Sequence, residues 1–381
     1  MSSGIQLTLK MGPVVVAPAP QIVMDALESV EVTHEAVANS AFQMTLRISN
    51  RSALNDIFLI ATGPTSAVSL GKIPLRVMVI VTINGVAQSL FDGVMTTVQV
   101  TPGQNGAAGQ INITGDDLTR VMTMFDWSGF LYPAMPIQAR VMAICAKYAM
   151  FGIVPMAIPS IFMDVPLPTS RIPTHQGTDL EYVREMADEL GYVFYIETGP
   201  TPGTNIAYFG PEVKVGVPQP ALNLDMDAHT NVESLNFNFD SSKGVLPVVF
   251  IQNPLTRAPI PIPIPDINPL QPPLGLIPAP ITNLKMLKDT AKLNLPRAIA
   301  RGVAEAARSQ DAVSANGSLN VLRYGRLLKA RGLVGVRGAG IAYDGLYFVQ
   351  QVKTTMSRGD IKQSFNLTRN GLVSITPKVP A

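Results

Sequence analysis

The sequence predicts a β-rich α+β fold that contains two related small β-barrels, with helix-containing segments inserted between them. Three observations carry this prediction. Both terminal regions contain runs in which apolar and polar residues alternate with the period of a β-strand. The order of turns and strands in the first region recurs in the last region. The middle of the chain instead shows apolar residues at helical spacing.

Composition predicts a protein that works inside an assembly. Of 381 residues, 47% are hydrophobic and only 15% are charged, whereas globular domains usually carry about a quarter of charged residues. A chain so poor in charge is expected to cover much of its surface in an obligate oligomer. The 29 basic and 27 acidic residues nearly balance, so nucleic acid is not expected as a partner.

The chain carries no sign of export or membrane insertion. Residues 1–10 lack a basic segment followed by an apolar core, so no secretory signal is expected. The longest charge-free apolar stretch, residues 148–163, is short and contains Pro155 and Pro159, which argues against a membrane span. Cys145 excludes an intrachain disulfide and is expected to be a small buried residue. We therefore expect a protein made in the cytoplasm.

Residues 1–116 are expected to form the first barrel. Residues 42–48 alternate strictly between apolar and polar side chains. Asn84-Gly85 between apolar runs predicts a tight hairpin, because both turn positions require positive φ. A long strand then follows Phe91-Asp92-Gly93, and a glycine-rich turn separates it from Gln110-Ile111-Asn112-Ile113-Thr114.

Residues 296–381 are expected to form the second barrel, because they repeat this order. Tyr343-Asp344-Gly345 precedes a long strand, as Phe91-Asp92-Gly93 does. A turn then leads into residues 363–368, which resemble residues 110–114. A single Asp-Gly match is weak evidence. The same order at nearly equal spacing is better evidence for a duplication.

Between the barrels, residues 117–170 are predicted to be a helical and apolar connecting segment. Leu118, Val121 and Met122 lie on one side of a short helix, and residues 136–151 have apolar side chains at helical spacing. Trp127 lies in the loop between these helices. Two interpretations of this tryptophan stay open: it anchors a contact, or it caps a core.

Residues 171–250 are predicted to be an α+β insertion. Thr178 and Glu181 have the spacing of a capping box, in which each side chain bonds a backbone N–H at the helix start. The helix is expected to cover residues 179–190 and to end at Gly191. Residues 192–196 then have the composition of a strand.

Residues 251–295 are predicted to be a proline-rich linker or strap. Proline and isoleucine alternate over residues 259–265, which should exclude a helix or a sheet interior and favour polyproline II. The segment is either a semi-rigid linker between domains or a strap whose isoleucines lie on a neighbouring subunit.

A helix is predicted next, over residues 296–307. Ile299, Val303 and Ala306 would form its buried stripe. Its arginines, at positions 297, 301 and 308, are expected on a solvated face.

The search for chemistry finds no nucleophile elbow and no phosphate-binding loop. Asp225, Asp227 and His229 form the one local cluster of carboxylates and imidazole. No further ligands lie nearby in the sequence, so we expect no metal. Catalytic and cofactor-binding residues are likewise not expected.

The helix–strand unit at residues 178–195 resembles a recurrent unit of the phage late control gene D proteins. That family includes the baseplate hubs of contractile phage tails and of contractile injection systems. The hub portion of the VgrG spike proteins of type VI secretion is similar. The motifs at residues 91–93, 343–345, 358–359 and 367–371 also resemble this family, and the resemblance covers roughly residues 40–375.

The resemblance implies a homotrimeric structural protein. In such hubs two related barrels per subunit form a ring of pseudo-sixfold symmetry, which joins a sixfold inner tube to a threefold spike. Only residues 372–381 follow Gly371, so the spike is expected to be a separate protein. The implied partners are the inner tube protein, the spike protein and other baseplate subunits, in a virion or a phage tail-like particle.

Two alternatives belong to other classes. One is a baseplate-associated cell-wall hydrolase that uses Asp225, Asp227 or His229. The other is a secreted β-sandwich binding module, which the missing signal and the single cysteine disfavour. For the hub, the candidate structural or interface residues are Phe91, Asp92, Gly93, Thr178, Glu181, Gly191, Tyr343, Asp344, Gly345, Arg369, Asn370 and Gly371.

Overall fold

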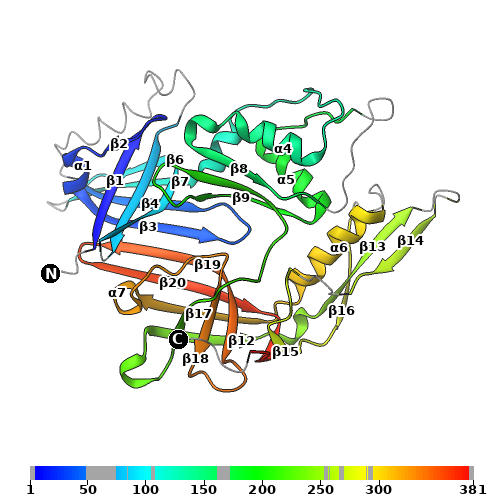
Figure 1. Cartoon of the computed structure of the whole chain (residues 1–381). Helices are drawn as coiled ribbons and strands as arrows, with labels where there is room; N and C mark the ends of the chain where they lie inside the picture. The colour runs from blue at the N-terminus through cyan, green and yellow to red at the C-terminus, as the bar shows by residue number, and fades with distance from the viewer. Residues whose placement is uncertain are drawn as a thin grey trace.

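The computed structural model is β-rich, with one large sheet, three small sheets and few helices (Figure 1). Among the described residues the large sheet has 13 strands, and all but one of its strand pairs are antiparallel. The structure describes residues 5–48, 74–83, 85–103, 108–160, 172–252, 256, 258–265, 270–288, 290 and 295–376.

The first half of the large sheet comes from the N-terminal region. Its strands lie side by side in the order β3 (Leu27–Glu35), β4 (Ala41–Ile48), β7 (Gly109–Asp117), β6 (Val86–Thr101), β5 (Arg76–Ile83) and β1 (Gln6–Gly12). The short strand β2 (Ala17–Pro18) and helix α1 (Gln21–Ala26) follow β1. Burial alternates along β4 because one face of the strand covers the core.

The second half repeats this arrangement. Its strands follow the order β12 (Val232–Phe239), β17 (Val313–Asn320), β20 (Asp360–Arg369), β19 (Gly345–Ser357), β18 (Leu333–Arg337) and β11 (Gln219–Asn223). The repeated order of elements in the sequence thus extends to strand pairing. The halves differ at the last strand, because β11 runs parallel to β18 whereas β1 runs antiparallel to β5. Closure of each half into a barrel stays a prediction.

The long strands β6 and β19 have matching roles. Each pairs with one neighbour along its first part and with another along its second part. Each also has a bulge, opposite β7 in one half and opposite β20 in the other. Such bulges bend a strand and increase its twist. The hairpin turns contain Gly85 and Gly359 at positive φ, a conformation that glycine adopts without steric cost.

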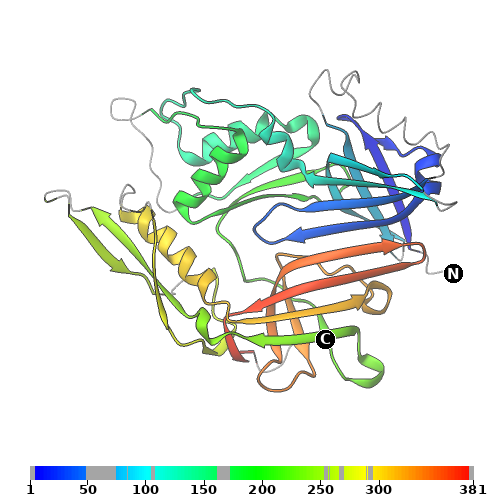
Figure 2. The ribbon, with the colours of Figure 1, turned by 180° about the vertical axis from the view of Figure 1, so that it is seen from behind.

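The two halves meet edge to edge where β3 pairs with β19. This seam runs from Glu35 opposite Gln351 to Ser29 opposite Ser357, and the two halves lie one above the other in both views (Figure 2). A continuous hydrophobic core accompanies it, since Val32 and Val352 belong to one buried cluster. The seam therefore joins the halves into a single sheet over a shared core.

An inserted unit follows β7. It contains η1 (Leu118–Thr123), α4 (Ile137–Ala146), η2 (Ala149–Phe151), β8 (Ile153–Ala157), α5 (Asp179–Leu190), β9 (Val193–Thr198) and β10 (Asn205–Gly210). The strands form a sheet in the order β8-β10-β9, with its own core. Cys145 lies in that core, as predicted, and burial raises the pKa of its thiol to about 12.

The capping box begins helix α5 where the sequence predicts it. The Thr178 hydroxyl accepts a hydrogen bond from the Glu181 backbone N–H (3.3 Å), and the Glu181 carboxylate accepts one from the Thr178 N–H (2.8 Å). Gly191 ends the helix at φ 68°. A Cβ at this glycine would lie 2.7 Å from the Ala300 carbonyl oxygen, so the close packing of another helix also requires glycine.

The remaining elements form an arm between β12 and β17. Strands β13 (Val245–Gln252), β14 (Pro259–Pro263) and β16 (Asn283–Met286) make a sheet on which α6 (Leu295–Ser309) packs. Strand β15 (Gly275–Pro278) pairs with β21 (Gly371–Ser374), which ties the arm to the end of the second half. Short turns complete the chain: η3 (Asp227–His229), η4 (Ser241–Lys243) and α7 (Val321–Tyr324).

The Pro-Ile repeat forms an edge strand, so the prediction of polyproline II was wrong. Neighbouring residues of a strand direct their backbone N–H groups to opposite sides. Ile262 lies opposite Val249 of β13, and the Ile264 N–H donates to the Pro247 carbonyl (2.9 Å). The isoleucines therefore make the backbone hydrogen bonds to β13. The nitrogen of Pro261, which carries no hydrogen, lies on the opposite side of the strand, where proline is tolerated because no hydrogen bond is needed.

Helix α6 also departs from expectation. Arg297 is buried and contacts Glu189 of α5 (3.2 Å), and Arg308 contacts Glu212 (3.3 Å). The prediction of a solvated arginine face was therefore wrong at these two positions. The helix packs closely on β13 at Gly302, where a Cβ would lie 2.9 Å from the Val249 side chain. Small residues let the helix pack close to its neighbours, so the carboxylates of Glu189 and Glu212 reach its arginines.

Among the described residues, no helix is both long and apolar enough to cross a bilayer.

The edge-strand geometry of β14 yields a matched pair of substitutions. Ile262→Pro removes an N–H that faces β13, so the local opening free energy of β13 amides should fall by about 1–3 kcal/mol. Pro261→Ala alters only the open edge and should change the opening free energy of the β13 amides by less than about 0.5 kcal/mol. Hydrogen exchange resolved to β13 measures both effects. Equal protection in the two variants would contradict the assigned register.

Candidate functional site

Phe91, Asp92 and Gly93 lie in the interior, where the first half meets the inserted unit. The Phe91 ring packs on the Phe42 ring with centroids 5.1 Å apart. The Asp92 carboxylate accepts hydrogen bonds from Arg76 Nε (2.7 Å) and Nη2 (2.5 Å). At Gly93 a Cβ would lie 2.5 Å from the Phe91 ring. The motif thus has a structural role within the chain.

Arg76 extends this contact into the inserted unit. Its Nη2 also donates to the Phe151 carbonyl (2.8 Å), and Asn205 Nδ2 donates to the same Asp92 carboxylate (2.8 Å). Both members of the ion pair are buried. Removing one of them would leave an unpaired charge in the interior, which costs several kcal/mol. The pair therefore holds the inserted unit against the first half.

Arg369 brings the two C-terminal motifs together. Its guanidinium is fully buried and donates to three backbone carbonyls: Gly371 O (2.7 Å), Asp344 O (2.9 Å) and Ala342 O (2.7 Å). The group also lies 4.5 Å from the centre of the Tyr347 ring, a cation–π contact. A planar group with five donors can satisfy several carbonyls at once. One side chain therefore fixes the turn at residues 342–345.

Neighbouring residues of these motifs complete the arrangement. The Asp344 carboxylate accepts from the Ala339 N–H (2.7 Å), and the Tyr347 hydroxyl donates to the Tyr343 carbonyl (2.7 Å). Asn370 Oδ1 accepts from the Gly275 N–H (3.0 Å) and so links the motif to β15. Arg369 thus bonds to two other predicted residues, Asp344 and Gly371, and Asn370 bonds to the arm.

Glycine is required at two of these positions. Gly345 has φ 128°, and a Cβ there would overlap the Ser374 side chain. At Gly371 a Cβ would overlap the carbonyl oxygen of Ile277 in β15. The close approach of β15 to β21 therefore depends on the absence of a side chain.

Sequence reasoning missed Arg76, Asn205 and Arg331. Arg331 lies 3.9 Å from the centre of the Tyr195 ring in the inserted unit, and its Nε donates to Ala36 O of the first half (3.1 Å). It thus links the second half, to which it belongs, to two other parts of the chain. Its partners lie more than a hundred residues away, so no local spacing could have indicated it.

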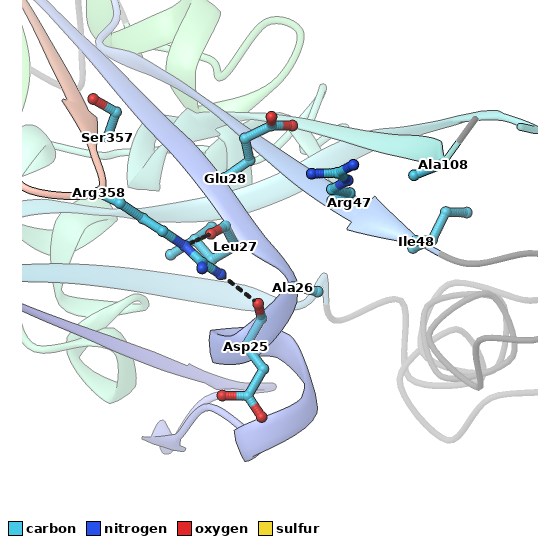
Figure 3. Close-up of a pocket in the computed structure, with 9 residues that line it drawn as sticks. All are labelled: Asp25, Ala26, Leu27, Glu28, Arg47, Ile48, Ala108, Ser357 and Arg358. Atoms are coloured by element: carbon cyan, nitrogen blue, oxygen red, sulfur yellow. Dashed lines mark hydrogen bonds between the residues drawn. The ribbon is translucent and has the colours of Figure 1, made fainter. Parts of the chain in front are cut away.

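A cleft of about 570 Å³ opens at the end of the seam (Figure 3). Arg358 crosses it and donates to the backbone carbonyls of Asp25 (2.7 Å) and Leu27 (3.4 Å). The lining combines two carboxylates with two guanidiniums and contains neither histidine nor cysteine. This mixture of charges suits a structural contact between the halves.

His34 lies on the seam, in β3 opposite Val352. Burial, together with the charge of Arg331, lowers the pKa of its imidazole to about 4. A hydrogen bond with the Leu90 backbone acts in the opposite direction. The folded protein therefore favours the neutral imidazole.

The residues considered for a hydrolase, Asp225, Asp227 and His229, are exposed on the connection between β11 and β12. Across the described parts of the chain, no three potential metal-binding side chains converge. The sequence cluster therefore does not become a geometrical cluster. No observation favours hydrolysis at this connection.

A buried polar cluster occurs in the inserted unit. The Asp179 carboxylate accepts from the Tyr148 hydroxyl (2.6 Å) and from the Lys147 ammonium (2.8 Å). His175 lies 3.6 Å from the same carboxylate, and its Nδ1 is 3.1 Å from the Tyr132 hydroxyl. Burial lowers the pKa of His175. The cluster joins helices α4 and α5 to the loops beside them.

Comparison with known proteins identifies the fold. No protein-family model and no curated protein matches the sequence. Two solved structures have a TM-score of 0.62: a tail protein from Neisseria meningitidis, at 12% identity over 97% of this chain and 98% of its own, and the 43 kDa tail protein of prophage MuSo2 from Shewanella oneidensis, at 14% identity over 96% and 98%.

A third structure is the c3393 protein of E. coli, a component of the type VI secretion system that is similar to T4 phage tail proteins. It has a TM-score of 0.52 and 10% identity, over 93% of this chain and 76% of its own. This chain therefore has a fold found in phage tail proteins and in a type VI secretion component. Such low identities show the fold alone.

Replacement of Arg369 tests its contacts with the backbone. Arg369→Lys keeps the charge but cannot reach three carbonyls, and hydrogen bonds to charged groups contribute about 1.5–3 kcal/mol each. We expect the free energy of unfolding to fall by at least about 3 kcal/mol, measured by urea unfolding at fixed protein concentration. The exposed Arg326→Lys is the control. A loss below about 1 kcal/mol at position 369 would contradict this role.

His34 makes the seam sensitive to acid. The unfolded imidazole gains a proton near pH 6.5, whereas the folded one stays neutral down to about pH 4. Stability present at pH 7 is therefore lost as the pH falls from 6.5 to 4. We expect the wild type to lose up to about 3 kcal/mol more than His34→Gln over this range. Unfolding curves at several pH values measure the difference, and parallel pH profiles would refute it.

Proposed function

We propose that the protein is the structural hub of a phage-tail or contractile injection baseplate, a homotrimeric adaptor between a sixfold inner tube and a threefold spike. The observation that carries the proposal is the duplicated strand order of the two halves. Three subunits with two equivalent halves each present six similar units around one axis. The fold shared with tail proteins supports the same class of role.

The seam within the chain suggests the contact between subunits. Within one subunit, β19 of the second half pairs with β3 of the first half. The equivalent strands are β6 in the first half and β12 in the second half. If the six units are related by pseudo-sixfold symmetry, β6 of one subunit pairs with β12 of its neighbour. The large sheet would then continue around the ring.

Exposure supports this assignment. Residues 351–357 of β19 have β20 on one side and β3 on the other, and most are shielded. The equivalent residues 96–101 of β6 pair with β7 and, among the described residues, with no second strand; most of them are exposed. Strand β12 is likewise the last strand of the sheet in the described part. Unpaired edges invite pairing with another chain.

Exposed apolar side chains away from the sheet add support. Val154 and Met156 of β8, and Leu284 and Met286 of β16, are exposed large hydrophobic residues. Groups of such residues on a soluble protein mark contacts with other proteins. The inner tube protein, a separate spike protein and other baseplate subunits are the partners we propose. The division of the chain into two barrel domains, a connecting segment, an α+β insertion and a proline-rich segment, which the sequence predicts, is part of the same proposal.

The proposed contact predicts a trimer that a single charge disrupts. Native mass spectrometry of the wild type should give three times the chain mass of 40.8 kDa. Val100→Lys places a charge on the open edge of β6. The affinity between subunits should therefore fall by at least about tenfold, while the circular dichroism spectrum stays unchanged.

The matched control is Val86→Lys, at an exposed position near the hairpin turn of the same strand. A wild-type monomer would refute the hub. A trimer that tolerates Val100→Lys would refute only the assigned contact.

A further inference from the structure

The loop between η1 and α4 presents a group of large apolar side chains to solvent. The exposed fractions are 47% for Phe125, 41% for Trp127, 55% for Phe130 and 53% for Leu131. Residues 125–131 are called the aromatic loop below. Ile172, which is 42% exposed, lies next to it in the adjoining segment. Aromatic residues of this kind dominate the energetics of protein interfaces.

The aromatic loop is held in one conformation. Two isolated β-bridges align it with residues 174–178, at Asp126 with Thr178 and at Leu131 with Thr174. Backbone hydrogen bonds reinforce them: Trp127 N to Gly177 O (3.1 Å), Gly129 N to His175 O (3.0 Å), His175 N to Phe130 O (2.8 Å) and Tyr132 N to Pro173 O (2.9 Å). A surface fixed before binding loses less conformational entropy when a partner arrives.

The polar cluster beneath the loop fixes the tryptophan. The Lys147 ammonium lies 4.4 Å from the centre of the Trp127 ring and also contacts Asp179 (2.8 Å). The indole therefore lies against the lysine of an ion pair whose carboxylate is buried, while much of the tryptophan side chain remains exposed. Trp127 thus covers an internal contact and also presents apolar surface to solvent.

Negative charge borders the apolar surface. Hydrogen bonds from the Ser128 hydroxyl and N–H lower the pKa of Asp126, and those from the Thr178 N–H and hydroxyl lower the pKa of Glu181. Both carboxylates therefore stay ionised at neutral pH. Asp126 forms a β-bridge with Thr178, whose N–H donates to the Glu181 carboxylate, so the two carboxylates lie in one region. Lys147, the cation beside Trp127, is already paired with Asp179.

We propose that the aromatic loop is a docking site for a different protein chain, whose surface offers an apolar pocket bordered by lysine or arginine. Apolar side chains on a fixed loop fit a pocket, and the two carboxylates select basic groups at its rim. The loop lies outside β6 and β12, so this contact is separate from the one proposed between subunits. The inference rests on the proposed function, because the partner belongs to the assembled particle.

A second copy of this chain is a poorer fit. Its seam cleft has apolar walls, but Asp25 and Glu28 accompany Arg47 and Arg358 there. The Arg358 guanidinium is also engaged with backbone carbonyls. Such a cleft does not complement a negative rim. Charge complementarity therefore favours a chain of another kind.

Site-specific crosslinking in assembled particles tests the proposal. A photoreactive benzoylphenylalanine replaces Leu131 in the full chain, and mass spectrometry identifies the crosslinked residue. We expect a crosslink to a different chain, within an apolar pocket that has Lys or Arg at its border. A crosslink to a second copy of this chain, or particles that incorporate the protein without any crosslink, would overturn the proposal. Absence of the protein from the particles would instead refute the proposed function.

Affinity measurements with the purified crosslinked partner separate the two parts of the site. Phe130→Ser should weaken binding by about thirtyfold or more, as loss of a central apolar anchor does. Asp126→Asn combined with Glu181→Gln keeps the hydrogen-bond acceptors but removes the charges. This variant should weaken binding by about three- to tenfold and reduce its dependence on salt.

The control is Val217→Ser, which removes an apolar side chain that is 94% exposed at another part of the surface. It should leave binding unchanged within about twofold. Equal losses at positions 130 and 217, or an undiminished affinity at position 130, would refute the docking site.

Discussion

Pairing of β3 with β19 is the constraint on which the rest of the structure depends. The register, from Glu35 opposite Gln351 to Ser29 opposite Ser357, connects strands more than three hundred residues apart. It fixes which faces of the two halves turn inward, because a shift by one residue would exchange the buried and exposed faces. It also merges the apolar side chains of both halves into one core. The inserted unit and the arm are positioned from this common sheet.

Three arginines, at positions 76, 331 and 369, make contacts that hold the halves, the inserted unit and the C-terminal turn together. Arg76 reaches the inserted unit through Asp92 and the Phe151 carbonyl. Arg331 joins the first half to the Tyr195 ring, and Arg369 holds the turn at residues 342–345. Each combines hydrogen bonds to backbone carbonyls with contact to an aromatic ring. A guanidinium suits this position because its planar donors satisfy several acceptors while its faces stack on rings.

The sequence predicts what is local and misses what is distant. The capping box at Thr178 and Glu181 is found because both partners lie within one helical turn. The repeated Asp-Gly motifs indicate the duplicated strand order because each motif is a short pattern of neighbouring residues. The Pro-Ile repeat misled because composition alone does not reveal which side of a strand each N–H faces. The Asp92–Asn205 contact joins residues 113 positions apart, and only the tertiary fold brings them together.

In the proposed hub, the placement of the insertions would let one chain match two symmetries. The halves share a strand order, but the arm lies between β12 and β17, whereas the equivalent strands β3 and β4 are joined directly. The inserted unit follows β7, while β20, its equivalent, leads into the short strand β21. In the proposed trimer the sheet would therefore repeat six times around the axis, and the insertions three times. A sixfold partner would meet the repeated sheet, and a threefold partner would meet the insertions. The aromatic loop lies in one of these insertions.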